Sequence, residues 1–88
     1  MSSMKEQRLR QLVAVCVKKG LNPKKTMFCN FILQVTASYY SFSKRTAKQY
    51  VDILIRAWHF DKWKSLVENN IHLTEEEKTE WINLQLQK

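Results

Sequence analysis

The chain is poor in the residues that punctuate strands, turns and disulfide scaffolds. It has one Gly, one Pro and two Cys in 88 residues. Hairpins depend on Gly, Pro and Asn in their turns, so this scarcity favours an all-α chain. Cys16 and Cys29 lie far apart, without the close ligand pairs of a zinc site or the density of a disulfide framework. We expect both to be buried free thiols.

The chain also lacks long apolar segments. No apolar run approaches the roughly 20 residues that span a bilayer, and Met1–Glu6 lack the apolar core of a signal peptide. We therefore expect a cytoplasmic protein without membrane contact. The hydrophobic share of 44%, with three Trp, three Tyr and four Phe, is enough for one core and predicts a single domain over residues 1–88.

Residue sets that support catalysis are missing as well. There is no Gly-rich phosphate loop and no His-Glu-x-x-His motif, and His59 and His72 are isolated. Three consecutive glutamates, Glu75–Glu77, belong to a helix start and predict capping rather than acid–base chemistry. We expect neither an enzyme nor a bound metal or cofactor, so binding must carry the function.

Positive charge is what the chain has in excess, with a formal net charge of +7. Residues 1–64 hold 13 Lys and Arg against three acidic residues, whereas residues 65–88 hold two Lys against five Glu. A basic body over residues 1–64 and an acidic C-terminal helix region, 74–88, fit a polyanion that approaches from one side. Solubility alone would also account for a net charge of this size.

Hydrophobic periodicity predicts a compact bundle of four to five helices. The first covers residues 4–19 and ends before Gly20, which suits a helix C-terminus. The second begins with Asn22 as N-cap and Pro23 at the first helical position, which puts Lys24 and Lys25 in its first turn. Its expected core face is apolar: Met27, Phe28, Phe31, Ile32 and Val35.

A stronger amphipathic pattern covers residues 43–58, where Ser43 is a favoured N-cap residue. The apolar residues form one stripe on a 3.6-residue helix: Ala47, Tyr50, Val51, Leu54 and Trp58. The opposite side is polar and mostly cationic: Lys44, Arg45, Lys48, Gln49, Asp52 and Arg56. A helix anchored on one side and basic at its exposed N-terminal end is typical of a reader of the DNA major groove.

The residues before this helix support the same interpretation, because only Tyr39–Phe42 separate it from the preceding helix. Two helices joined by a tight turn resemble the helix-turn-helix family of DNA-binding domains. That family has a small residue where the helices cross, matched by Ala37, and usually Gly in the turn, where this chain has Ser41. A hydrophobic residue follows the turn, matched by Phe42.

The resemblance continues into the second helix and covers about twenty residues. Ser43 and Thr46 match the Ser-x-x-Thr start of that helix, and Ala47 and Tyr50 match its buried positions. The resemblance implies a domain that inserts this helix into double-stranded DNA. We expect contacts in the groove from Lys44, Arg45, Lys48 and Gln49. Contacts to phosphate oxygens are expected from Ser41, Ser43 and Thr46. General electrostatic attraction is expected from Arg56, Lys24 and Lys25.

Residues 62–73 leave two interpretations open. Trp63, Leu66 and Val67 have helical spacing, with Asp61 as the expected cap, and predict a short helix from residue 62 to about residue 69. A winged helix would instead pair two short strands around an Asn-Asn turn. Beyond them, residues 74–77 read Thr-Glu-Glu-Glu, a capping box that predicts a last helix running toward the C-terminus.

A second class of function is a small accessory subunit of a DNA-processing assembly, which would act through protein contacts. Residues 45–81 resemble, in general character, small basic proteins of thermophilic archaea, including viral regulators and accessory subunits of a replicative family-B DNA polymerase. Aromatic residues are enriched at such interfaces. The candidates are Tyr39, Tyr40, Phe60, Trp63 and Trp81. A homodimer would use the last helix, through Trp81, Ile82, Leu84 and Leu86.

Overall fold

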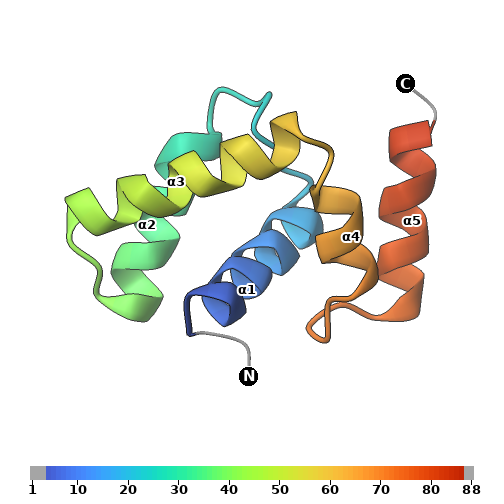
Figure 1. Cartoon of the computed structure of the whole chain (residues 1–88), viewed down its shortest axis with the longest axis horizontal. Coiled ribbons are helices and arrows are strands. Elements are labelled where there is room, and N and C mark those ends of the chain that lie inside the picture. Colours follow the sequence, from blue (N-terminus) through green and yellow to red (C-terminus); the bar gives the residue numbers. More distant parts are fainter. Residues whose placement is uncertain (1–3, 87–88) are drawn as a thin grey trace.

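A computed structural model describes residues 4–86 and contains five helices (Figure 1). They are α1 (Met4–Lys19), α2 (Phe28–Tyr40), α3 (Lys44–His59), α4 (Trp63–Glu68) and α5 (Glu75–Leu86). The prediction of an all-α bundle is confirmed. The winged alternative is wrong, because residues 63–68 form α4 and the described residues contain no strand. None of these helices is both long and apolar enough to cross a bilayer.

The first helix, α1, is the central element of the bundle. It lies between the α2–α3 pair and the α4–α5 pair (Figure 1) and packs against α3, α4 and α5. All five helices surround one core, whose buried residues are Leu12, Val13, Ala14, Cys16, Phe28, Ile32, Tyr50, Val51, Leu54, Trp63, Val67 and Leu73. The Trp63 indole N–H donates to the Leu54 carbonyl at 3.0 Å, so this buried polar group is satisfied.

The connection between α1 and α2 differs from the prediction. Gly20 has a φ of +69° after the last turn of α1, which fits the expected C-terminus. However, α2 begins at Phe28, well after the expected cap at Asn22. The Asn22 Oδ1 accepts from the Lys24 amide at 2.8 Å, and its carbonyl accepts from the Lys25 amide at 3.0 Å. Asn22 therefore closes a local turn instead of a helix.

Because α2 starts late, the residues of its buried face also differ from those predicted. Phe28 and Ile32 are buried as expected, but Met27 precedes the helix and is 69% exposed. Cys29 is exposed as well, so the expectation of a buried thiol is wrong there. It lies about 100° around the helix from Phe28. Cys16 is buried as predicted, and burial raises the pKa of its thiol to about 12.

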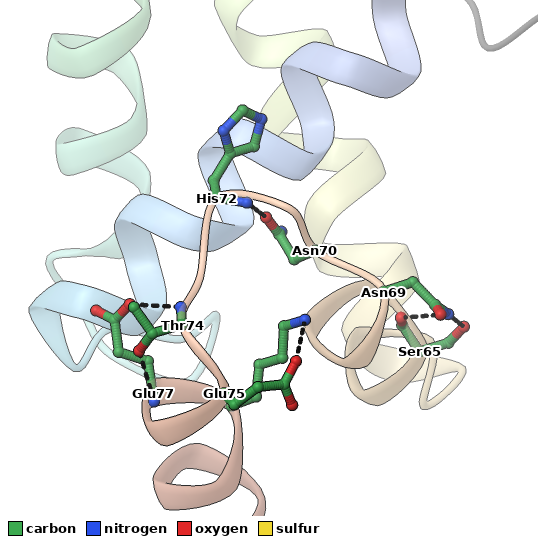
Figure 2. Close-up of polar contacts among 8 residues, drawn as sticks. Ser65, Asn69, Asn70, His72, Thr74, Glu75 and Glu77 are labelled. Carbon is green, nitrogen blue, oxygen red and sulfur yellow. Dashed lines mark hydrogen bonds and ion pairs between the residues drawn. The ribbon is translucent and has the colours of Figure 1, made fainter.

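A buried asparagine ties the α4–α5 connection to α1. The Asn70 Nδ2 donates to the Arg10 carbonyl at 2.8 Å, and its Oδ1 accepts from the His72 amide at 2.9 Å. Figure 2 shows the second of these bonds. Asn70 is fully buried. Its bond to Arg10 joins two distant segments, whereas its bond to His72 is local to the loop. One side chain thus fixes the loop against the middle of the central helix.

The predicted capping box at the start of α5 is confirmed (Figure 2). The Thr74 amide donates to the Glu77 carboxylate at 2.9 Å, and the Glu77 amide donates to the Thr74 hydroxyl at 3.1 Å. The expected cap of α4 is wrong. Asp61 has a φ of 57°, and Lys62 occupies the N-cap position without a side-chain hydrogen bond. The left-handed Asp61 turns the chain from α3 into α4.

Candidate nucleic-acid interface

The turn between α2 and α3 has a left-handed residue at its first position. Ser41 has φ and ψ of 55° and 33°, and its amide donates to the Thr36 carbonyl. The Phe42 amide donates to the same carbonyl at 3.3 Å. A left-handed residue that lets the next amides reach back to the last turn is a common way to end a helix, and Gly is preferred there. Ser41 therefore adopts, without being glycine, the left-handed conformation that glycine favours at a helix end.

Three aromatic rings and one arginine pack around this turn. The Phe42 ring lies 5.1 Å from the Tyr40 ring and 5.0 Å from the Tyr50 ring of α3. The Arg8 guanidinium lies over Phe42 at 5.1 Å and over Tyr40 at 5.5 Å. We call these four residues the turn cluster. Cation–π contacts of this kind contribute roughly 0.5–2 kcal/mol each.

A hydrogen bond from α1 completes the support of the turn. The Tyr40 hydroxyl donates to the Gln11 Oε1, and burial raises the pKa of this phenol, with the Arg8 charge acting in the opposite direction. In the sequence, Arg8 is one of several basic residues of the first helix, and nothing marks Gln11. Their i, i+3 spacing puts both on one side of α1, but no local signal identifies the distant rings that they meet.

The match of Ala37 to the small residue at the helix crossing is wrong. Ala37 is exposed, whereas its neighbour Thr36 is fully buried. The reason is the spacing of the buried face of α2, which passes through Phe28, Ile32 and Thr36 in steps of four. The Thr36 hydroxyl donates to the Ile32 carbonyl at 2.7 Å, so the buried oxygen has a partner.

The third helix, α3, begins and is anchored as predicted. The Ser43 hydroxyl accepts from the Thr46 amide at 3.3 Å, which confirms the N-cap. Ala47, Tyr50, Val51 and Leu54 are buried, and Trp58 is half-buried. One side of the helix is thereby fixed against the bundle.

The other side of α3 carries every polar residue that was expected there. The exposed side chains are Lys44, Arg45, Lys48, Gln49, Asp52 and Arg56. Lys44, Lys48, Asp52 and Arg56 follow one another at steps of four, so they form one row along the helix. No described residue forms an ion pair with Lys44, Arg45 or Lys48. The first two turns of α3 therefore present three cationic groups and one amide to solvent.

The remaining expected DNA contacts are distributed less favourably. Ser41 and Ser43 are exposed. The Ser43 hydroxyl lies 3.1 Å from the Thr46 hydroxyl, so the side chains of Ser43 and Thr46 are engaged in capping α3. Lys24 lies beside Trp58, at the C-terminal end of α3. Lys25 lies beside Lys18 and Lys19. The structure therefore does not bring Lys24 and Lys25 together with the basic first turns of α3.

Candidate protein contacts are scattered over the surface. Trp63 is buried in the core and so is not available to a partner, whereas Tyr39 is 75% and Phe60 is 66% exposed. These two lie near opposite ends of α3 and do not form one patch. Of the expected dimer contacts, Trp81 and Ile82 are half-buried and Leu84 is 54% exposed, while the Leu86 side chain lies outside the described part.

Comparison of the chain with protein-family models, with curated proteins and with solved structures found no match. Within residues 4–86 no group of three or more His, Cys, Asp or Glu side chains is placed to hold a metal ion. The candidate interface thus consists of an anchored helix, α3, with a basic exposed side, and of the preceding turn, which residues of α1 contact.

Proposed function

We propose that this protein binds double-stranded DNA without catalysing a reaction, and that it inserts the first turns of α3 into the major groove. One observation carries the proposal: Lys44, Arg45, Lys48 and Gln49 are all exposed on the side of α3 that faces away from its buried stripe. A single helix fits the major groove of B-DNA, which is about 12 Å wide.

The N-terminal end of α3 is suited to a polyanion for a second reason. The first amides of a helix point outward and carry a partial positive charge, which favours phosphate. In this chain Lys44, Arg45 and Lys48 add three full charges to the same end of the helix. Phosphate contacts of this kind supply much of the affinity for DNA.

The chemistry of the exposed side chains assigns them different roles in this complex. Arg45 pairs with the acceptor edge of guanine, and Gln49 pairs with the donor and acceptor of adenine. Each such paired contact discriminates against the wrong base by about 1–3 kcal/mol. Lys44 and Lys48 are charge contacts to phosphate and carry no base preference.

The test is a duplex mobility-shift or anisotropy titration at two salt concentrations, with random-sequence and genomic duplexes. We expect the triple variant Lys44→Ala/Arg45→Ala/Lys48→Ala to lose the shift. Because all three side chains are exposed, its circular dichroism spectrum and melting temperature should match those of the wild type.

A matched control removes three cations elsewhere, in Lys18→Ala/Lys19→Ala/Lys62→Ala. These side chains are also exposed, and they lie away from the N-terminal end of α3. The control should retain most of the affinity. Equal losses in both triple variants would show that total charge, rather than the exposed side of α3, drives binding, and the groove assignment would be withdrawn.

A further inference from the structure

A half-open cavity of about 400 Å³ lies on the opposite side of the bundle from the turn cluster, where α3, α4 and α5 meet. Its walls include all three tryptophans of the chain, Trp58, Trp63 and Trp81. Pockets that bind small molecules commonly measure about 300–1,000 Å³. The cavity is therefore large enough for a ligand with one or two rings.

The indole rings form the apolar part of the cavity. Trp58 lies 5.2 Å from Trp63 and 6.4 Å from Trp81, and both pairs meet edge to face. Trp63 is buried and forms the floor, whereas Trp58 and Trp81 are half-buried and form the sides. Such walls suit a planar ring.

The rim of the cavity is charged. The Lys24 and Lys64 side chains are exposed and come from different elements, the α1–α2 connection and α4. Asp61, in its left-handed turn, adds one carboxylate to the same wall. Two ammonium groups against one carboxylate leave the rim cationic, which favours an anionic group at the mouth.

From this geometry we infer that the tryptophan cavity binds a planar aromatic molecule that carries an anionic group, such as a nucleotide or an aromatic carboxylate. The ring lies in the cavity against Trp58 and Trp81, and the anion lies near Lys24 and Lys64. This site is separate from the DNA-binding side of α3, and its test contains no DNA, so the two proposals succeed or fail independently.

Intrinsic fluorescence reports on this site directly, because the chain has no tryptophan outside it. The probes are adenosine monophosphate and benzoate, each titrated beside a neutral analogue, adenosine and benzamide, at constant ionic strength. We expect a saturable change in tryptophan emission, with at least one anion binding about fivefold tighter than its neutral analogue. A preference for the nucleotide or for the carboxylate identifies the source of the ligand.

Two variants with opposite expected effects test the charged rim. Lys24→Ala/Lys64→Ala should remove the preference for the anion. Asp61→Asn removes the carboxylate from the rim and should tighten anion binding about twofold. Asn also tolerates a left-handed conformation, so the turn is kept. Lys5→Ala/Lys19→Ala removes two exposed lysines of α1 outside this cavity and should leave binding unchanged. All these side chains are exposed, so folding is preserved.

Three results would overturn the inference. They are the absence of a saturable change with either anion up to millimolar concentration, equal binding of anions and neutral analogues, and unchanged anion binding in Lys24→Ala/Lys64→Ala. Trp81→Leu adds a check on the aromatic wall and should weaken binding about tenfold, since the ligand loses one aromatic contact.

Discussion

At the scale of single residues, Ser41 marks where the turn before α3 is strained. A left-handed conformation costs a non-glycine residue roughly 1–2 kcal/mol, and Ser41 has a φ of 55°. We expect Ser41→Gly to raise the free energy of unfolding by about 0.5–1 kcal/mol, because the relief of strain exceeds the added entropy of the unfolded chain. Urea denaturation followed by circular dichroism measures it.

Gly20 provides the reverse experiment. It has a φ of +69°, and a Cβ atom built there meets nothing within 4 Å. Gly20→Ala should therefore destabilise the protein by about 1 kcal/mol through backbone strain alone. If Ser41→Gly lowers stability and Gly20→Ala leaves it unchanged, left-handed strain does not determine the effect of substitution at these two positions.

Asn70 is the residue whose loss should cost most among the polar side chains described. Asn70→Ala removes the side-chain bonds to the Arg10 carbonyl and to the His72 amide. We expect the free energy of unfolding to fall by about 2–3 kcal/mol. The neighbour Asn69 is exposed and bonds only within its own helix end, to Ser65. Asn69→Ala should change stability by less than about 0.5 kcal/mol, and equal effects would show that Asn70 does not fix the loop against α1.

At the scale of elements, the capping box makes α5 sensitive to acid. The bond from the Thr74 amide lowers the pKa of the Glu77 carboxyl below its ordinary value of 4.5, and the Lys18 charge acts in the same direction. A lowered pKa means that ionised Glu77 stabilises the folded state above pH 4.5. That stabilisation is lost as the pH falls through the lowered value.

Replacing Glu77 should therefore flatten the acid side of the stability profile. We expect the melting temperature of Glu77→Gln to fall less than that of the wild type between neutral pH and pH values below 4.5. Gln retains the bond to the Thr74 amide without the charge. Glu76→Gln removes the same charge one residue away and should follow the wild-type profile. Identical profiles for the two variants would argue against a contribution of the Glu77 charge to stability through the capping box.

The helices could be predicted where the sequence states both their start and their buried stripe. Ser43 and Thr74 each mark a cap that the structure contains, and the stripe from Ala47 to Leu54 is buried. The start of α2 could not be predicted, because Asn22 supports a turn and a helix cap equally well by composition. Asp61 misled in the same way, because a residue that caps helices also tolerates left-handed turns.

The candidate interface was predictable in its exposed part only. Amphipathic spacing identifies Lys44, Arg45 and Lys48 as solvent-facing, because one helix face determines the other. The support beneath them, from Arg8 and Gln11, depends on contacts between residues about thirty positions apart. No local pattern encodes such pairs, and Arg8 reads as one more basic residue until the rings of the turn cluster are placed.

At the scale of the whole molecule, the proposed phosphate contacts predict how binding to DNA should depend on salt. The logarithm of the affinity falls linearly with the logarithm of salt concentration, with a slope of about −0.9 per phosphate contact. We expect each single alanine variant of Lys44 or Lys48 to reduce that slope by about one, measured by anisotropy over several salt concentrations. Lys18→Ala, near Glu77 and away from the N-terminal end of α3, should leave the slope unchanged.

The central position of α1 also has a consequence for synthesis. This helix leaves the ribosome before the elements that cover it, and its apolar side packs against α3 and against α4, which ends at Glu68. Leu12, Val13 and Cys16 thus stay without their final neighbours until α4 has been translated. Nascent chains halted before α4 should be captured by chaperones that recognise exposed apolar surface, and those halted beyond α5 should escape them.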